Sequence, residues 1–345
     1  MSSLSEQSWV ADPTVTWNIV LTARLATSPS RSEVALALAR LAQEQGWPEP
    51  TEDAVRVGEV EALRARLAAD VDVACPVSIG IDGSALVLSA HHSQVDGVGL
   101  LALLRDLAGI PVSSWARGAG ERPDAPALRS LVSRLAEVAV APPARVYESA
   151  TTPVAQDVFA VRSVAGGWRT ADLVEAGAAA LGRWNASHGS RTRRIAVAVG
   201  VSRTGGADLV VGENSGWLRI RNVERLTRPE VAQAVSSAPL VTTPTGVRRS
   251  RPVRDRLVSA GLRVMAPRLG STLLVSHLGR VEATGVEDVA FFPVTGGGSG
   301  LALGAVSLSG RTLLTLRARG AQHSNEGLQT MLETLVEELG SSRGD

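Results

Sequence analysis

The sequence predicts a mixed α/β (α+β) protein built from two sandwich lobes, and three observations support that prediction. The chain has 345 residues, of which 44% are apolar, and this suits two lobes or one large domain with a sizeable core. Apolar residues recur with helical and strand periods in alternation along both halves. A stretch rich in Pro, Ala and Thr at 141–153 marks a boundary, so we expect lobes at 1–145 and 146–345.

The elements of the first half follow from local signals. Ser30 with Glu33 has the spacing of a capping box, and Gly46 marks the end of that helix. Asp82-Gly83 is typical of a tight hairpin turn between apolar segments. Besides the helix between Ser30 and Gly46, we expect in order a strand at 15–25, a helix at 54–69, strands at 71–81 and 85–90, and a helix at 98–108.

The second half repeats this alternation. Thr170 can cap one helix and Ser324 the last one, in which apolar residues recur at helical spacing. Between them, alternating apolar residues predict strands at 195–201, 217–223, 271–278 and 302–318.

Composition excludes several kinds of site. The chain has no Lys, so all 35 basic residues are Arg, and Schiff-base, P-loop and Ser-Lys chemistry are excluded. Cys75 is the single cysteine, which rules out an internal disulfide, and its apolar neighbours predict a buried, inert thiol. A net charge of +1 gives no general argument for nucleic-acid binding. Without an apolar run of ~18 residues or a recognisable signal peptide, we expect no membrane association and a reducing, cytoplasmic location.

Two adjacent histidines at the end of an apolar strand are the strongest candidates for chemistry. Side chains of an extended strand alternate in direction, so His91 and His92 have different surroundings and do not share a metal ion. A neutral imidazole accepts a proton from an amine or hydroxyl nucleophile near pH 7. Asp96 follows a short turn, and Gly97 permits a tight reversal of the chain there. From this spacing alone, a structural pair of histidines is an equally good interpretation.

The segment His91-His92-x-x-x-Asp96-Gly97 resembles the HHxxxDG signature of nonribosomal peptide synthetase condensation domains and related CoA-dependent acyltransferases. The resemblance is thin but extends over nearly the whole chain, and it implies two chloramphenicol-acetyltransferase-like lobes in a V, with a tunnel at their junction. Further segments are similar to that family in the same order, namely 17–19, 196–203, 211–221, 276–279 and 300–316.

The resemblance also implies roles for individual residues. His92 would face the tunnel and contact the attacking group, and the backbone of Gly97 would lie close to the reacting centre. His91 would be structural. Asp96 would point away from substrate and pair with an arginine, for which Arg203 is the best candidate.

Three residues of the second lobe are candidates for the tunnel. Ser276 could donate a hydrogen bond to an oxyanion, while His277 and Trp217 could line the wall, although ordinary packing explains them equally well. The chain departs from the family pattern at Gln43–Trp47, where an arginine-rich segment is expected, and at Gly216-Trp217, where an Asn-Thr pair is expected. These departures concern substrate and carrier recognition.

A strongly basic segment lies at 248–268, which contains seven arginines and one acidic residue. It suggests a dock for an acidic carrier protein or for the phosphates of CoA or phosphopantetheine, although a solvated helix and loop explain it too. The docking candidates are Arg248, Arg249, Arg251 and Arg254. The glycine-rich residues 296–300 predict a flexible loop, because no Lys follows them as in a phosphate loop.

The resemblance implies an acyltransferase that joins a thioester-activated acyl group to an amine or an alcohol in natural-product biosynthesis. The donor would be acyl-phosphopantetheine on an acyl or peptidyl carrier protein, or acyl-CoA, with no bound metal or redox cofactor. Two alternatives stay open: a CoA-dependent O-acyltransferase that modifies a finished small molecule, and a non-catalytic condensation-like protein that binds a carrier.

Overall fold

The computed structural model describes residues 17–70, 76–119, 140–148, 154–206, 209–241, 270–295 and 300–341. Several predictions lie outside these residues: the buried Cys75, part of the 141–153 boundary, the loop at 296–299 and the basic segment from Arg248 to Arg268. Among the described residues, each helix is too short or too polar to cross a bilayer.

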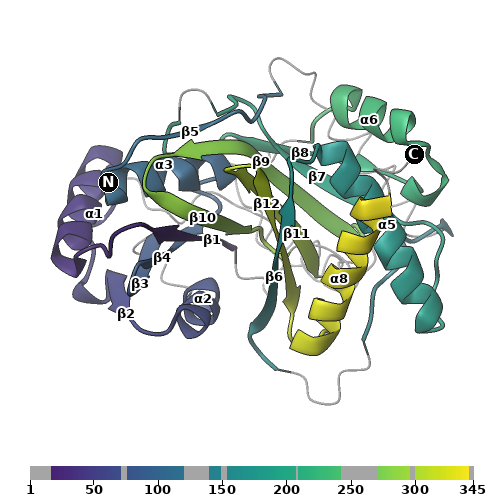
Figure 1. Cartoon of the computed structure of the whole chain (residues 1–345), viewed down its shortest axis with the longest axis horizontal. Coiled ribbons are helices and arrows are strands. Elements are labelled where there is room, and N and C mark those ends of the chain that lie inside the picture. The colour runs from purple at the N-terminus through teal and green to yellow at the C-terminus, as the bar shows by residue number, and fades with distance from the viewer. Residues whose placement is uncertain are drawn as a thin grey trace, which may run out of the picture.

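The chain folds into two lobes, each built on its own β-sheet (Figure 1). The first sheet has the strand order β10-β1-β4-β3-β2, and the second has the order β6-β12-β11-β9-β7-β8, with β5 paired to β9. The elements of the N-terminal half are β1 (Asn18–Leu25), α1 (Arg31–Gln45), β2 (Val55–Val57), α2 (Val60–Ala69), β3 (Val77–Asp82), β4 (Ala85–His91), α3 (Gly97–Ala108) and β5 (Val112–Ser114). The later elements are β6 (Asp157–Ala165), α5 (Thr170–Ser187), β7 (Val197–Ser202), β8 (Ser215–Ile220), α6 (Arg228–Ser237), β9 (Leu273–Ala283), β10 (Val286–Phe292), β11 (Leu301–Leu308), β12 (Arg311–Arg319) and α8 (Asn325–Ser341).

Helices cover both faces of the first sheet. Alternate residues of β1, beginning at Ile19, pack into a core with α1 and α3, whereas Val20 packs on the other face with Leu63 and Leu67 of α2. Because both faces are buried, β1 is apolar along most of its length instead of alternating with polar residues. This burial fixes the register of β1 against β4, and with it the place where the histidine motif begins.

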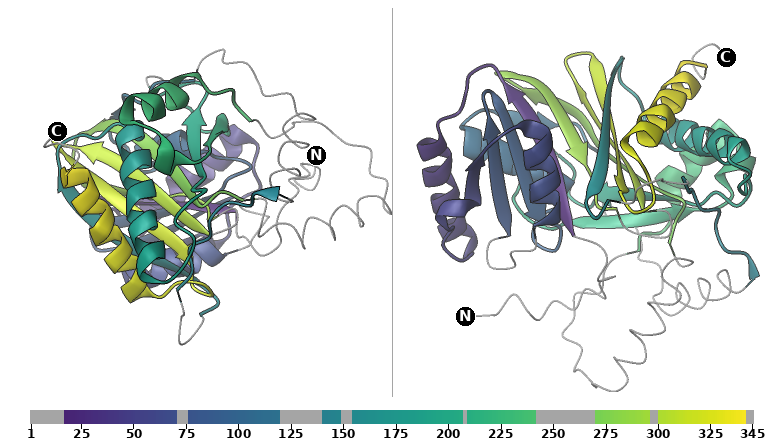
Figure 2. Two further views of the ribbon diagram at one scale, coloured as in Figure 1. Left: turned by 90° about the vertical axis from the view of Figure 1, so that its right-hand side faces the viewer. Right: turned by 90° about the horizontal axis from the view of Figure 1, so that it is seen from below.

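The second sheet is covered by helices on one face, where α5 and α8 lie side by side (Figure 2). Its other face packs against the edge strand of the first sheet: the Thr315 hydroxyl of β12 donates to the carbonyl oxygen of Phe291 in β10. Gly304 of β11 lies directly under that carbonyl, and a Cβ at this position would collide with it. A glycine is therefore required where the two sheets approach each other.

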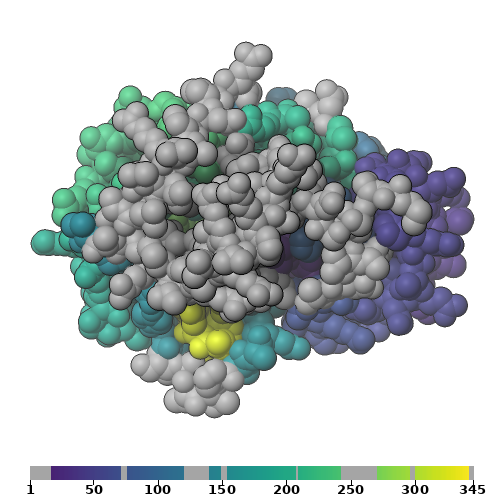
Figure 3. All heavy atoms as spheres, turned by 180° about the vertical axis from the view of Figure 1, so that it is seen from behind, coloured from purple at the N-terminus to yellow at the C-terminus, as the bar shows by residue number. Residues whose placement is uncertain are grey.

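Two strands each pair with the sheet that is built mainly from the other half of the chain. β10 comes from the C-terminal half and pairs with β1, and β5 comes from the N-terminal half and pairs with β9. Apart from these two strands, the described strands of the first sheet come before residue 145 and those of the second sheet after residue 146, and the lobe boundary at 145/146 stays a prediction. Seen from behind, the purple and blue first lobe and the teal to yellow second lobe occupy opposite sides of the molecule (Figure 3).

Most predicted elements of the mixed α/β fold are confirmed, including the hairpin with Gly83 at φ 54° and the left-handed Gly46 that ends α1. The single helix at 54–69 is wrong, because Val55–Val57 forms a strand parallel to β3 and the helix begins only at Val60. The capping box at Ser30 is also wrong: its hydroxyl pairs with the Ser32 hydroxyl and not with the helix backbone. Ser324 does cap α8, through the backbone amide of Gly327 at 2.9 Å.

Candidate active site at the lobe junction

The histidine motif forms the connection between β4 and α3. The strand ends at His91, and the chain then turns, with the amide of Gln94 donating to the His91 carbonyl at 2.9 Å. The amide of His92 donates to the carbonyl of Trp17, next to the start of β1, at 2.8 Å. His92 is thus the first residue of the turn, and its backbone is held by the neighbouring strand.

The two imidazoles are held in opposite ways. Nδ1 of His92 lies 3.2 Å from the carbonyl oxygen of Val95, and because a carbonyl only accepts, Nδ1 must carry the proton. In the neutral ring the lone pair then lies on Nε2. Nδ1 of His91 accepts from the amide of Ser93 at 3.3 Å, so its proton lies on Nε2.

These tautomers give the residues different roles. Both rings are half-buried. Burial, followed by the charge of His92, lowers the pKa of His91, which keeps His91 neutral. His92 presents a basic nitrogen, whereas His91 is bound to its own turn through Ser93.

Asp96 begins helix α3 and connects it to the other lobe. It is 3% exposed, and its Oδ1 accepts from the amide of Gly99 at 2.7 Å as the N-cap of the helix. Its Oδ2 accepts from the amide of Asn214 at 3.0 Å, and its own amide donates to the carbonyl of Gly212 at 2.9 Å. Burial raises the pKa of the Asp96 carboxyl, against the lowering effect of the two amide bonds and of His92.

The expected pairing of Asp96 with the Arg203 guanidinium is not among these described contacts and stays a prediction. The structure does bring Arg203 to the motif through the backbone: its amide donates at 2.8 Å to the carbonyl of Asn214, the residue whose own amide binds Asp96.

Gly97 is required by close packing. A Cβ on Gly97 would lie 2.7 Å from Cδ2 of Leu278 and 3.0 Å from Cζ of Phe291, which come from β9 and β10. Its φ is not positive, so the expected tight reversal at Gly97 is wrong; the residue is the first of α3. The glycine allows the start of α3 to lie directly against the strands at the lobe junction.

The three tunnel candidates lie on two different faces of the second sheet. Gly200 of β7 pairs with Ser276 on one side and Trp217 on the other, and directly paired residues share a face. Gly304 also pairs with Ser276, so this is the face that packs against β10. Ser276 and Trp217 therefore lie on the side of the first lobe.

His277 lies on the opposite face from Ser276, against α5. Its Nδ1 is 3.4 Å from Oγ1 of Thr170, and its Nε2 is closed off from solvent, without a partner among the described residues. Burial lowers the pKa of His277 to about 4, opposed by the charge of Asp172. His277 and Ser276 therefore do not line one passage.

Sequence reasoning missed the residues of the second lobe that complete the motif. Gly212 and Asn214 lie in the segment similar to the family pattern, so the signal was present, but nothing in it indicated contact with Asp96. Arg317, which donates to the carbonyl of Asn18 on β1, was also missed, because an arginine on a strand is ordinarily exposed, whereas this one is 0% exposed.

No protein-family model matches the chain, and no curated protein sequence matches it. Several solved structures match its fold. The starter condensation domain of rhizomide synthetase, crystallised with C8-CoA, is 14% identical with a TM-score of 0.55, over 97% of this chain and 91% of that one. The first condensation domain of the calcium-dependent antibiotic synthetase, in complex with a substrate analogue, is 15% identical with a TM-score of 0.55, over 97% and 94%.

A third structure belongs to a related kind of domain. The epimerization domain of the third module of tyrocidine synthetase B is 14% identical with a TM-score of 0.50, over 98% of this chain and 96% of that one. At these identities the likeness concerns the fold. The resemblance read from the sequence is confirmed at this level: the chain has the fold of the condensation-domain superfamily.

Proposed function

We propose that this chain is a condensation-type acyltransferase in which His92 contacts the attacking amine or alcohol. The observation that carries the proposal is the bond between Nδ1 of His92 and the Val95 carbonyl, because it leaves the basic lone pair on Nε2. A structural pair of histidines needs no such tautomer. The condensation-domain fold and the position of His92 at the junction of the lobes support the same conclusion.

The reaction is transfer of an acyl group from a thioester. The nucleophile attacks the carbonyl carbon, and its proton passes to Nε2 of His92. Collapse of the tetrahedral intermediate breaks the carbon–sulfur bond, and the proton of the imidazolium leaves with the thiolate as the free thiol. The products are an amide or an ester and the thiol of CoA or phosphopantetheine. General base assistance of this kind contributes a factor of about 10²–10⁴.

We assign the surroundings of the reacting centre to residues of both lobes. Gly97 brings the backbone at the start of α3 close to the centre, since a side chain there is excluded by Leu278 and Phe291. Ser276 supplies a hydroxyl from the second lobe to the oxyanion, and Trp217 forms the wall on the same face of the sheet. Donor and acceptor would reach this junction through a tunnel between the lobes.

We propose a donor that carries its acyl group on a phosphopantetheine arm. Two solved structures of similar fold support this choice: the rhizomide synthetase domain was crystallised with C8-CoA, and the other is the first condensation domain of the calcium-dependent antibiotic synthetase, in complex with a substrate analogue. An acyl carrier protein and acyl-CoA present the same arm, so the two sources must be compared directly. The acceptor is a small amine or alcohol.

The experiment that tests the proposal follows thiol release and product mass. Purified protein is mixed with octanoyl-CoA, or with the same acyl group on a carrier protein, and with pools of amines and alcohols. The proposal expects a product formed by the wild type at a rate at least about 10²-fold above that of His92→Ala. Equal rates for the two proteins with every donor would overturn it, and would favour a protein that only binds a carrier.

A further inference from the structure

The edge of β1 that faces β10 continues past the end of its partner strand. The pairing of the two strands stops at Val20 and Phe292, and Pro293 follows directly. Beyond this point the carbonyl of Asn18 is bound by a side chain: Nη1 of Arg317 donates to it at 2.6 Å and to the Pro293 carbonyl at 3.2 Å. The guanidinium thus supplies the donor that the strand ladder would have provided.

The bond to Asn18 lies one residue away from the bond that holds His92. Successive carbonyls of a strand point to opposite sides, so Asn18 faces Arg317 while Trp17 faces β4 and accepts from the His92 amide at 2.8 Å. Asn18 is also the residue of β1 paired with His91. Any shift of this end of β1 is therefore passed to the backbone of His92.

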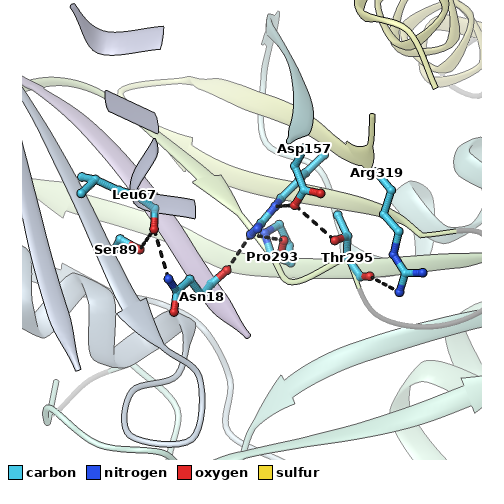
Figure 4. Close-up of polar contacts among 8 residues, drawn as sticks. Asn18, Leu67, Ser89, Asp157, Pro293, Thr295 and Arg319 are labelled. Atoms are coloured by element: carbon cyan, nitrogen blue, oxygen red, sulfur yellow. Dashed lines mark hydrogen bonds and ion pairs between the residues drawn. The ribbon is translucent and has the colours of Figure 1, made fainter. Parts of the chain in front are cut away.

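Arg317 is itself fixed in the second lobe. It lies on β12, and its Nε donates to Oδ2 of Asp157 on β6 at 2.7 Å. Asp157 also accepts from the Thr295 hydroxyl at 3.3 Å, and the guanidinium lies 5.7 Å from the ring centre of Phe159. Figure 4 shows Asp157 and Thr295 to the right and Asn18, whose side-chain amide donates to the carbonyl of Leu67, to the left.

We propose that Arg317 is a positioning residue for the acyl transfer. It holds the end of β1 against β12, and so keeps the backbone of His92 at a fixed place relative to the second lobe. The inference rests on the proposed function for its catalytic consequence, but its structural part stands on the backbone of His92 alone.

Arg64 of α2 provides a matched comparison at the same junction. It is 8% exposed and lies over the rings of Phe292, at 4.7 Å, and Phe159, at 5.9 Å. Unlike Arg317, it makes no hydrogen bond to β1 among the described residues, and its Nε has no partner there. Both side chains are buried arginines against Phe159, but among the described residues only Arg317 donates a hydrogen bond to β1, the strand beside His92.

The test compares Arg317→Lys, Asp157→Asn and Arg64→Lys in the full chain. Amide hydrogen exchange is followed in the peptide 89–95, which contains the His92 amide, and is normalised to the peptide 301–308 of β11. We expect Arg317→Lys and Asp157→Asn to raise the normalised exchange rate at least about fivefold, and Arg64→Lys to leave it within twofold. Asp157→Asn weakens the bond that holds the Arg317 guanidinium in the second lobe. If Arg317→Lys does not fold, the exchange rate in Asp157→Asn tests the inference.

Steady-state kinetics supply the second arm. Displacement of a reacting group by about 1 Å costs as much as 10²-fold in rate, so we expect kcat to fall by about 10- to 100-fold in Arg317→Lys, with the donor KM changed less than threefold. An unchanged exchange rate in 89–95 for both Arg317→Lys and Asp157→Asn would overturn the inference, as would equal losses of kcat in Arg317→Lys and Arg64→Lys. If the wild type transfers no acyl group, the proposed function fails, and the exchange data still decide whether Arg317 positions His92.

Discussion

The amide of Asn214 donates to Oδ2 of Asp96 at 3.0 Å, across 118 residues of sequence. The same carboxylate caps α3 through Gly99, so one side chain both starts the helix after the histidine motif and joins it to the second lobe. The candidate site is therefore built from contacts of both lobes.

Replacing Asp96 should destabilise the protein as well as impair the site. In Asp96→Ala the amides of Gly99 and Asn214 both lose a charged acceptor, and we expect the free energy of unfolding to fall by about 2–4 kcal/mol. Urea denaturation measures this loss. Asp106→Ala, on the same helix and partly exposed beside Arg105, should cost less than about 1 kcal/mol. Similar losses in both variants would show that the amide contacts of Asp96 contribute little.

The raised pKa of Asp96 predicts a specific dependence on pH. The folded protein keeps a proton on this carboxyl at pH values where the unfolded chain, with a pKa near 3.9, has released it. The contribution of Asp96 to stability is therefore largest below pH ~4 and declines as the pH rises through the folded-state pKa. The difference in unfolding free energy between wild type and Asp96→Asn should become less favourable to the wild type from pH 4 to pH 8. A constant or rising difference is the contrary result.

Gly97→Ala should be destabilising because there is no space for a methyl group. The added Cβ would lie 2.7 Å from Leu278 and 3.0 Å from Phe291, and overpacking of this kind typically costs about 1–3 kcal/mol. Gly167→Ala is the matched control, since a Cβ there would meet no atom within 4 Å. Thermal unfolding of the two variants should separate them by several degrees, and equal melting temperatures would disprove the packing role.

His277 should make the protein sensitive to acid. Its pKa is about 4 in the folded state, whereas the unfolded side chain takes up a proton near pH 6.5. The contribution of neutral His277 to the free energy of unfolding is therefore fully present above pH 6.5. It is lost as the pH falls toward 4, by at most about 3 kcal/mol. Between pH 7.5 and 4.5 the wild type should lose more stability than His277→Asn, whereas the exposed His188→Asn should follow the wild type. Parallel losses in His277→Asn and wild type would contradict this account.

Local signals predicted much of the fold because they report on local structure. The Asp82-Gly83 turn, the glycine after α1 and the Ser324 cap each depend on a few neighbouring residues. The strand Val55–Val57 was mistaken for a helix because its pairing with β3 overrides the helical composition around it. The addition of β10 to the first sheet depends in the same way on a partner far away in the sequence.

The candidate site was predictable only in part, for the same reason. The histidine motif is contiguous, so His91, His92, Asp96 and Gly97 are recognisable together. The residues that hold it in place are distant in sequence: Asn214 acts through its backbone amide, which is independent of its side chain. Arg317 is likewise hidden, because its burial follows from the contact between lobes and not from its neighbours on β12.

The most direct test of the account is the turnover of His92→Ala at constant fold. In the proposed mechanism His92 contacts the acceptor through Nε2, and because its side chain is only half-buried we expect its removal to leave the melting temperature within a few degrees. We predict that kcat for thiol release from acyl-CoA or an acyl carrier protein falls by about 10²–10⁴ in His92→Ala. Undiminished turnover in a folded His92→Ala protein would contradict the central claim.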